Sequence, residues 1–260
     1  MKNKLLLNIG AYVCLVIINV MALQIPFFGK TPGDVSDLYP NMLTPADFTF
    51  SMWSFIYVLL GIFTFHQILL VYQKAYSSTH EVSAIGPLFV ISCVLNISWL
   101  IAWQSLHIAL AFGLIFVLWV VLIYLVYRLE HIEKVRLQYA IPFSVYLGWI
   151  SVAALANLNV LFIHSGFGFF GLSDEHWTAT LIGIGICGTL FILYLSKDIW
   201  FTAVLIWAFF GIYVKNKQLD LDGNWVIYMS IIAMVFLSLV GGYAAMKKWQ
   251  ESKNHTGTAV

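Results

Sequence analysis

Eight apolar runs dominate this chain, and each is long enough to cross a membrane. A hydrocarbon core ~30 Å thick needs roughly 17 to 25 apolar residues per helix. The seventh run is the shortest, a length that also suits a re-entrant or strongly tilted segment. The pattern predicts an all-α integral membrane protein with about eight transmembrane helices. The runs lie near Leu5 to Leu23, Phe48 to Tyr72, Ala84 to Trp103, His107 to Tyr127, Tyr139 to Phe162, Trp177 to Leu195, Ile199 to Val214 and Trp225 to Met246.

Composition agrees with a membrane protein and excludes several functions. Of the 260 residues, 61% are hydrophobic and only 10% are charged. The net charge of +1 and the lack of a long basic run argue against nucleic-acid binding. Cys14, Cys93 and Cys187 all lie inside apolar runs, so their spacing indicates neither a disulfide framework nor a thiolate metal site.

The first apolar run has a second interpretation. The residues MKNK precede it and VMA ends at Ala22, which resembles a signal peptide with its cleavage site. Removal of this segment would leave seven spans in the same orientation.

The distribution of Lys and Arg predicts the orientation. With a cytoplasmic N-terminus, ten of the thirteen fall on the cytoplasmic side, as the positive-inside rule requires. We therefore expect a multi-pass protein of the cell (plasma) membrane with both termini in the cytoplasm and the segment from Thr31 to Pro45 outside. The ten are Lys2, Lys4, Lys74, Arg128, Lys134, Arg136, Lys197, Lys247, Lys248 and Lys253.

Ionisable residues are nearly absent from the interiors of the predicted spans, apart from histidine and the terminal Asp47. Such residues usually mark ion or proton paths, so a rhodopsin and most ion-driven transporters are disfavoured, whereas a carrier of neutral or amphipathic molecules is not. His66 is intramembrane, but no second ligand lies at metal or haem spacing on its run. A buried histidine with a hydrogen-bond partner, or one that snorkels toward the membrane surface, is the simpler interpretation.

The segment that begins the second run carries a helix-start signal. Thr44 suits an N-cap, Pro45 suits the first helical position, and Asp47 stands where the acid of a capping box would stand. The pattern predicts that the carboxylate caps the helix and interacts with its dipole rather than with a ligand.

Three runs carry aromatic residues in stripes at helical spacing. One stripe contains Phe50, Trp53, Tyr57 and Gly61, and the other two combine aromatics with asparagine. Such faces suit a pocket for a flat amphipathic ligand, and they equally suit helix packing with asparagine as a hydrogen-bonding link. The second stripe is Asn96, Trp99 and Trp103, and the third is Pro142, Tyr146, Trp149, Ala153 and Asn157.

These stripes lie in segments that resemble a known family. The sequences SMWSFIYVLLG (51–61), LNISW (95–99) and YLGWISVAALAN (146–157) are similar to the tryptophan-rich sensory proteins, the TspO/MBR family that includes the mitochondrial translocator proteins. The likeness is to the larger bacterial branch with extra C-terminal helices. It implies a five-helix core over residues 1–165, a three-helix extension over 166–247 and a polar cytoplasmic tail over 248–260.

The resemblance also implies a ligand cavity, closed by the loop from Gly29 to Leu43, that binds porphyrins or other hydrophobic molecules. Sterol binding of the mitochondrial type is not implied, because the Tyr and Arg tied to it are missing after Asn157. The residues that would face or support the cavity are Trp53, Tyr57, Asn96, Trp99, Tyr146, Trp149, Ala153 and Asn157.

We therefore expect a membrane-embedded binding protein for a hydrophobic or amphipathic ligand, of tetrapyrrole or porphyrin type, acting in sensing, sequestration or transport. Two alternatives stay open, a porphyrin-modifying membrane enzyme and a transporter of a neutral or amphipathic solute. No motif requires a cofactor or a metal, and a porphyrin or haem-type ligand is compatible with the stripes. The expected partners are the lipid bilayer and the ligand, without nucleic acid, and a homodimer stays open.

Overall fold

The computed structural model describes residues 2–73, 80–132, 135, 137–219 and 224–257. These residues form helices and turns, and seven of their helices are long and apolar enough to cross a membrane. The predicted class, an all-α integral membrane protein, is confirmed. The chain divides into two compact units, of which the first contains Met1–Asn41 and Phe50–Phe170 and the second contains Met42–Thr49 and Gly171–Val260.

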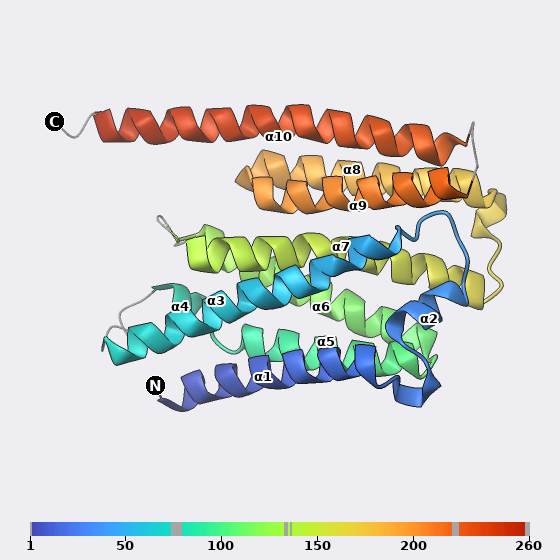
Figure 1. Cartoon of the computed structure of the whole chain (residues 1–260). Helices are drawn as coiled ribbons and strands as arrows, with labels where there is room; N and C mark the ends of the chain where they lie inside the picture. Colours follow the sequence, from blue (N-terminus) through green and yellow to red (C-terminus); the bar gives the residue numbers. More distant parts are fainter. Residues whose placement is uncertain (1, 74–79, 133–134, 136, 220–223, 258–260) are drawn as a thin grey trace. The chain divides into compact units, whose positions relative to one another are not determined.

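The contacts between helices make the first unit a closed ring of five long helices, labelled α1, α3, α5, α6 and α7 in Figure 1. Going round the ring, α1 packs on α3, α3 on α7, α7 on α6, α6 on α5, and α5 again on α1. Shorter elements complete the unit, with α4 against α6, and η1 and α2 against α5. The long helices are α1 (Lys2–Gln24), α3 (Met52–Tyr72), α5 (Leu88–Gln104), α6 (Ile108–Glu130) and α7 (Leu137–His164), and the short elements are η1 (Phe27–Gly29), α2 (Pro32–Asp37), α4 (His80–Ile85) and η4 (Phe169–Gly171).

Helix α1 shows why these helices form a ring in lipid. Its inner face contains Leu15 and Asn19, both buried, whereas Val13 and Ile17 lie on the outer face and are exposed. Exposed aliphatic side chains suit contact with lipid tails, while polar side chains turn inward to find partners. The helix is thus held by its buried face, and its lipid-facing side is as apolar as its core.

Several helices differ in length from the predicted runs, α10 by continuing from Met246 to Gly257, and two of the differences change which span is the shortest. Helix α9 (Ile199–Gln218) has 20 residues and continues past Val214, whereas α5 has 17 and is the shorter apolar helix. Two causes extend α9. Lysines in a last turn interact favourably with the helix dipole, and the Asn216 side chain is buried and bonded.

The predicted cap before α3 is wrong. Helix α3 begins at Met52 with Ser51 as N-cap, and the 3-10 helix η2 (Asp47–Ser51) precedes it. Thr44 therefore lies too far from α3 to cap it, although Asp47 does stand in the first turn of η2. The cause is a tertiary contact, since the Ala46 amide donates to the carbonyl of Gly211, 3.0 Å away.

The second unit packs α8, α9 and α10 against one another, with residues 42–49 on α9. The acidic stretch from Ser173 to His176 is mostly helical, because Ser173 caps α8 and Asp174 begins it. Asp198 caps α9 by accepting from the amides of Trp200 and Phe201, each at 3.0 Å. The two helices not yet given bounds are α8 (Asp174–Ser196) and α10 (Trp225–Gly257).

The family-based division into residues 1–165, 166–247 and 248–260 stays a prediction. The same holds for the orientation, because Lys74, Lys134 and Arg136 lie outside the described residues. The described helices place the chain across a membrane several times, without naming the membrane or the side on which the termini lie.

Candidate functional site

Trp53, in the first turn of α3, is the centre of an aromatic cluster in the first unit. Its ring stacks on Trp99 of α5 at 5.5 Å between centroids and on Tyr57 at 6.1 Å, and it meets Trp149 of α7 edge-on at 6.2 Å. Offset-stacked and edge-to-face pairs at such distances are favourable. Trp53 thus contacts three other predicted site residues, which lie on three helices, and we call these four residues the aromatic cluster.

Polar side chains join two of these helices, α5 and α7, beside the cluster. The Asn96 amide donates to the Tyr146 hydroxyl at 3.1 Å, and the Trp99 indole N–H donates to the Asn157 amide oxygen at 3.1 Å. Asn157 in turn donates to the carbonyl of Ala153 at 2.9 Å. These bonds fix the orientation of the two asparagines and of the Trp99 ring.

Two donors in the cluster lack a partner. In the part of the chain that the structure describes, neither the buried hydroxyl of Tyr57 nor the buried indole N–H of Trp149 forms a hydrogen bond. A buried donor without a partner costs about 1–3 kcal/mol, and in a native structure it calls for an explanation. A bound molecule with hydrogen-bond acceptors would satisfy both donors.

All eight predicted site residues lie on α3, α5 and α7 of one unit. Trp99, Tyr146, Trp149, Asn96 and Asn157 are buried. Trp53, Tyr57 and Ala153 are partly exposed and are therefore the accessible members of the group.

The sequence analysis missed the contribution of α1. Asn19 donates to the Asn96 amide oxygen at 3.1 Å, and the Tyr12 hydroxyl donates to the Tyr57 carbonyl at 3.0 Å. The close approach of Tyr12 also requires Gly61, where a Cβ would lie 2.6 Å from the Tyr12 oxygen. A signal was available, because Asn8, Tyr12 and Asn19 recur at helical spacing in an otherwise apolar run.

The predicted lid is fastened to the end of α5. The indole N–H of Trp103 donates to the carbonyl of Pro32 at 3.0 Å, and the Gln104 amide donates to the carbonyl of Lys30 at 2.8 Å. A further contact joins Tyr39 to His164 of α7, with 3.0 Å between hydroxyl oxygen and Nδ1. Helix α2 therefore lies at the end of the ring where α5 and α7 end (Figure 1).

Within the lid, α2 begins with a capping box. The Thr31 hydroxyl accepts from the Asp34 amide, and the Asp34 carboxylate accepts from the Thr31 amide at 2.7 Å. The hydrogen bonds from Thr31 lower the pKa of Asp34 below its ordinary value. The carboxylate therefore stays ionised and holds the first turn of the lid helix in place.

A Gln104→Leu variant is expected to loosen the lid without unfolding the ring. It removes bonds to the carbonyls of Lys30 and Ala22, each worth about 0.5–1.5 kcal/mol, so amide exchange of residues 29–37 should accelerate roughly tenfold. Leucine also removes a buried amide oxygen that has no partner among the described residues, so the melting temperature should change little. Hydrogen exchange by mass spectrometry measures the first effect.

The matched control is Gln67→Leu, which removes a buried glutamine bonded to Asn8. It should leave exchange of residues 29–37 unchanged. Equal exchange in the wild type and in Gln104→Leu would contradict the role of Gln104 in fastening the lid.

His66 has a partner, as its interpretation required. Its Nδ1 lies 3.1 Å from the hydroxyl oxygen of Tyr139, and the two rings meet edge-on at 5.4 Å. Across the described residues, no three His, Cys, Asp or Glu side chains are grouped as metal ligands would be. The contacts of His66 are those of a packed histidine.

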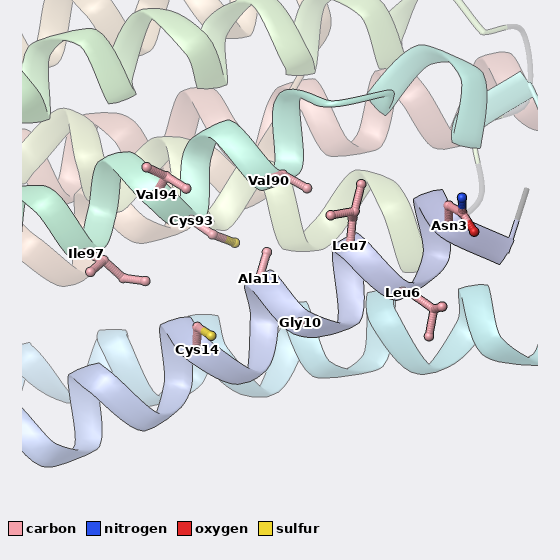
Figure 2. A pocket seen from close by; sticks show the side chains of 10 residues that line it. All are labelled: Asn3, Leu6, Leu7, Gly10, Ala11, Cys14, Val90, Cys93, Val94 and Ile97. Atoms are coloured by element: carbon pink, nitrogen blue, oxygen red, sulfur yellow. The ribbon is translucent and has the colours of Figure 1, made fainter.

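A hollow lies between α1 and α5 (Figure 2). It is a groove of about 660 Å³, and none of the eight predicted site residues lines it. Small residues on α1 open it, and its walls are almost entirely apolar, which suits hydrocarbon. Its lining includes Gly10, Ala11 and Cys14 from α1 and Val90, Cys93 and Val94 from α5.

Comparison with known proteins gives one result. A family model described as TSPO-like protein matches residues 5–243. The match extends from α1 into α10, so it includes the three helices of the predicted C-terminal extension. No curated protein and no solved structure matches the chain.

Proposed function

The chain belongs to the TSPO-like protein family, and from this we propose that it binds a flat, amphipathic ligand of the tetrapyrrole class at the aromatic cluster. The family indicates a membrane-embedded protein of the ligand-binding or sensing kind. The ligand and the use made of it, in sensing, sequestration or transport, are part of the proposal.

The observation that carries the proposal is the pair of buried donors beside Trp53. The Tyr57 hydroxyl and the Trp149 indole N–H have no partner among the described residues, and Trp53 contacts both rings. A molecule with a flat π-face and peripheral acceptors matches this arrangement, because it can stack on Trp53 while its acceptors meet the two donors.

The proposed entrance for the ligand is at the end of the helix ring that the lid covers. Trp53 is partly exposed, whereas its neighbours Trp99 and Trp149 are buried. Since these rings already touch one another, we propose that the ligand enters as the lid opens and Trp53 rotates. By the positive-inside argument this end faces outward from the cell membrane, with both termini in the cytoplasm.

A titration tests the binding. Protein in lipid nanodiscs is titrated with protoporphyrin IX while its tryptophan fluorescence is followed. The proposal predicts saturable quenching that a saturated fatty acid does not compete away, because the fatty acid offers no flat face. Quenching that rises linearly without saturation, as in protein-free nanodiscs mixed with a tryptophan derivative, would contradict it.

A further inference from the structure

Residues 42–49 connect the two units in an unusual way. Met42–Thr49 packs as part of the second unit, whereas the chain on both sides of it, Asn41 and Phe50, belongs to the first. We call Met42–Thr49 the strap. The three C-terminal helices therefore hold the last two residues of the predicted lid, Met42 and Leu43, and the residues that lead from them toward α3.

The C-terminal end of the strap is seated on α9. The Ala46 amide donates to the Gly211 carbonyl at 3.0 Å, and the Trp207 indole N–H donates to the Thr49 carbonyl at 3.2 Å. Phe48 packs edge-on against Trp207 at 5.3 Å. Thr49 is fully buried, so the C-terminal end of the strap is held in one position on α9.

Glycine is required at that seat. A Cβ on Gly211 would overlap the Thr49 side chain and would lie 2.9 Å from Cβ of Pro45. Both obstacles belong to the short, closely packed strap, so any larger residue must displace the strap or α9.

The N-terminal end of the strap is held by all three helices of the second unit or their flanks. The Asn216 amide of α9 donates to the Met42 carbonyl at 2.9 Å, and the backbone of Met42 bonds to the carboxylate of Asp174 in α8. Asn224, directly before α10, places its amide nitrogen 3.3 Å from the Met42 sulfur. A change in the packing of α8, α9 and α10 therefore displaces Met42.

The strap leads directly into the aromatic cluster. Thr49 is its last residue, and the next residue, Phe50, meets Trp149 edge-on at 6.2 Å. Trp53 follows one turn later, and η2 joins α3 without a break. Because a continuous helical segment is stiff, displacing Thr49 must displace Phe50 and Trp53 with it.

We propose that the strap couples occupancy of the aromatic cluster to the packing of α8, α9 and α10, which makes the C-terminal helices the output element of the protein. This inference rests on the proposed ligand site. Coupling between two sites is reciprocal, so ligand at Trp53 changes the hold on the strap, and loosening the strap changes ligand affinity by the same factor.

Gly211→Ala tests the coupling without altering any residue of the aromatic cluster. In ligand-free protein, amide exchange of Ala46 and Thr49 should accelerate, and that of residues 52–57 should change with it. Affinity for protoporphyrin IX should fall at least fivefold, the lower end of typical coupling. Gly188→Ala in α8 is the matched control, because nothing lies within 4 Å of its Cβ, and it should leave both readouts unchanged.

A second variant covers the case in which Gly211→Ala does not fold. Trp207→Phe keeps an aromatic ring beside Phe48 and removes the indole N–H that bonds to Thr49, and it should shift the same amides in the same direction. Faster exchange of the strap, with residues 52–57 and porphyrin affinity as in the wild type, would overturn the coupling. If the wild type bound no porphyrin, the proposed function would be wrong. Amide exchange in the ligand-free protein would still show whether the strap is coupled to residues 52–57.

Discussion

A Trp53→Ala variant is expected to bind protoporphyrin IX roughly tenfold to a hundredfold more weakly than the wild type, because stacking on one aromatic side chain is worth about 1–3 kcal/mol. Trp53 is the member of the aromatic cluster that touches the other three, Tyr57, Trp99 and Trp149. Removing it takes away the stacking face and also the contact that orients the neighbouring rings. The dissociation constant is best measured from porphyrin absorbance, since the substitution itself alters tryptophan fluorescence.

The control for this loss is Trp225→Ala, the same substitution at an exposed position of α10. Its affinity should match that of the wild type. If both variants bound porphyrin equally well, the ligand would have to lie elsewhere, and the groove between α1 and α5 would be the first place to look (Figure 2).

The largest effect on stability is expected from Phe63→Ala, near the middle of α3. Phe63 is fully buried and meets Phe89, Tyr139 and Phe143 edge-on at 4.8, 5.6 and 5.0 Å. Truncating such a residue costs about 3–5 kcal/mol in soluble cores. In a membrane, the part of this cost that comes from moving an apolar side chain out of water is small, whereas the lost packing contacts still count. We therefore expect the free energy of unfolding to fall by about 3 kcal/mol, seen as a melting temperature lower by roughly 10 °C.

Phe65→Ala is the matched comparison, on the same helix two residues away. Phe65 is 60% exposed, so it faces lipid and leaves no cavity when truncated. Its melting temperature in the same nanodiscs should lie within roughly 2 °C of the wild type. A loss as large as that of Phe63→Ala would mean that the inner and outer faces of α3 are assigned wrongly.

The aromatic stripes show what the sequence could predict. Residues three and four apart share a helix face, so spacing alone placed Trp53 with Tyr57, and Trp99 with Asn96. The structure brings the stripes of α3, α5 and α7 together in one unit. Whether these residues bind a ligand stays a prediction, because packed rings and a ligand pocket call for the same residue types.

The segment before α3 shows what the sequence could not predict. Thr44, Pro45 and Asp47 carry a sound local signal for a helix cap, yet residues 42–49 are held instead by α9, more than 150 residues later in the chain. A local pattern contains no information about such a contact. Gly211 is the residue that permits it, and a glycine inside an apolar run does not name its partner.

The hydropathy pattern did not predict the length of α9, for a related reason. Lys215 and Lys217 end the apolar run, so hydropathy places the boundary at Val214. The helix continues to Gln218 because Asn216 is buried and bonds to the Met42 carbonyl. By contrast, His66 was interpreted as a histidine with a hydrogen-bond partner, and its contact with Tyr139 confirms this.

If a ligand satisfies the unpartnered donors of the aromatic cluster, the indole N–H resonance of Trp149 reports the new hydrogen bond itself. In 15N-labelled protein in nanodiscs, identified with a Trp149→Phe variant, this resonance should move downfield on saturation with protoporphyrin IX as the N–H gains an acceptor. The indole N–H of Trp119 already donates to Ser151 at 2.9 Å and should stay in place. Saturable porphyrin binding with the Trp149 resonance unmoved would contradict the account.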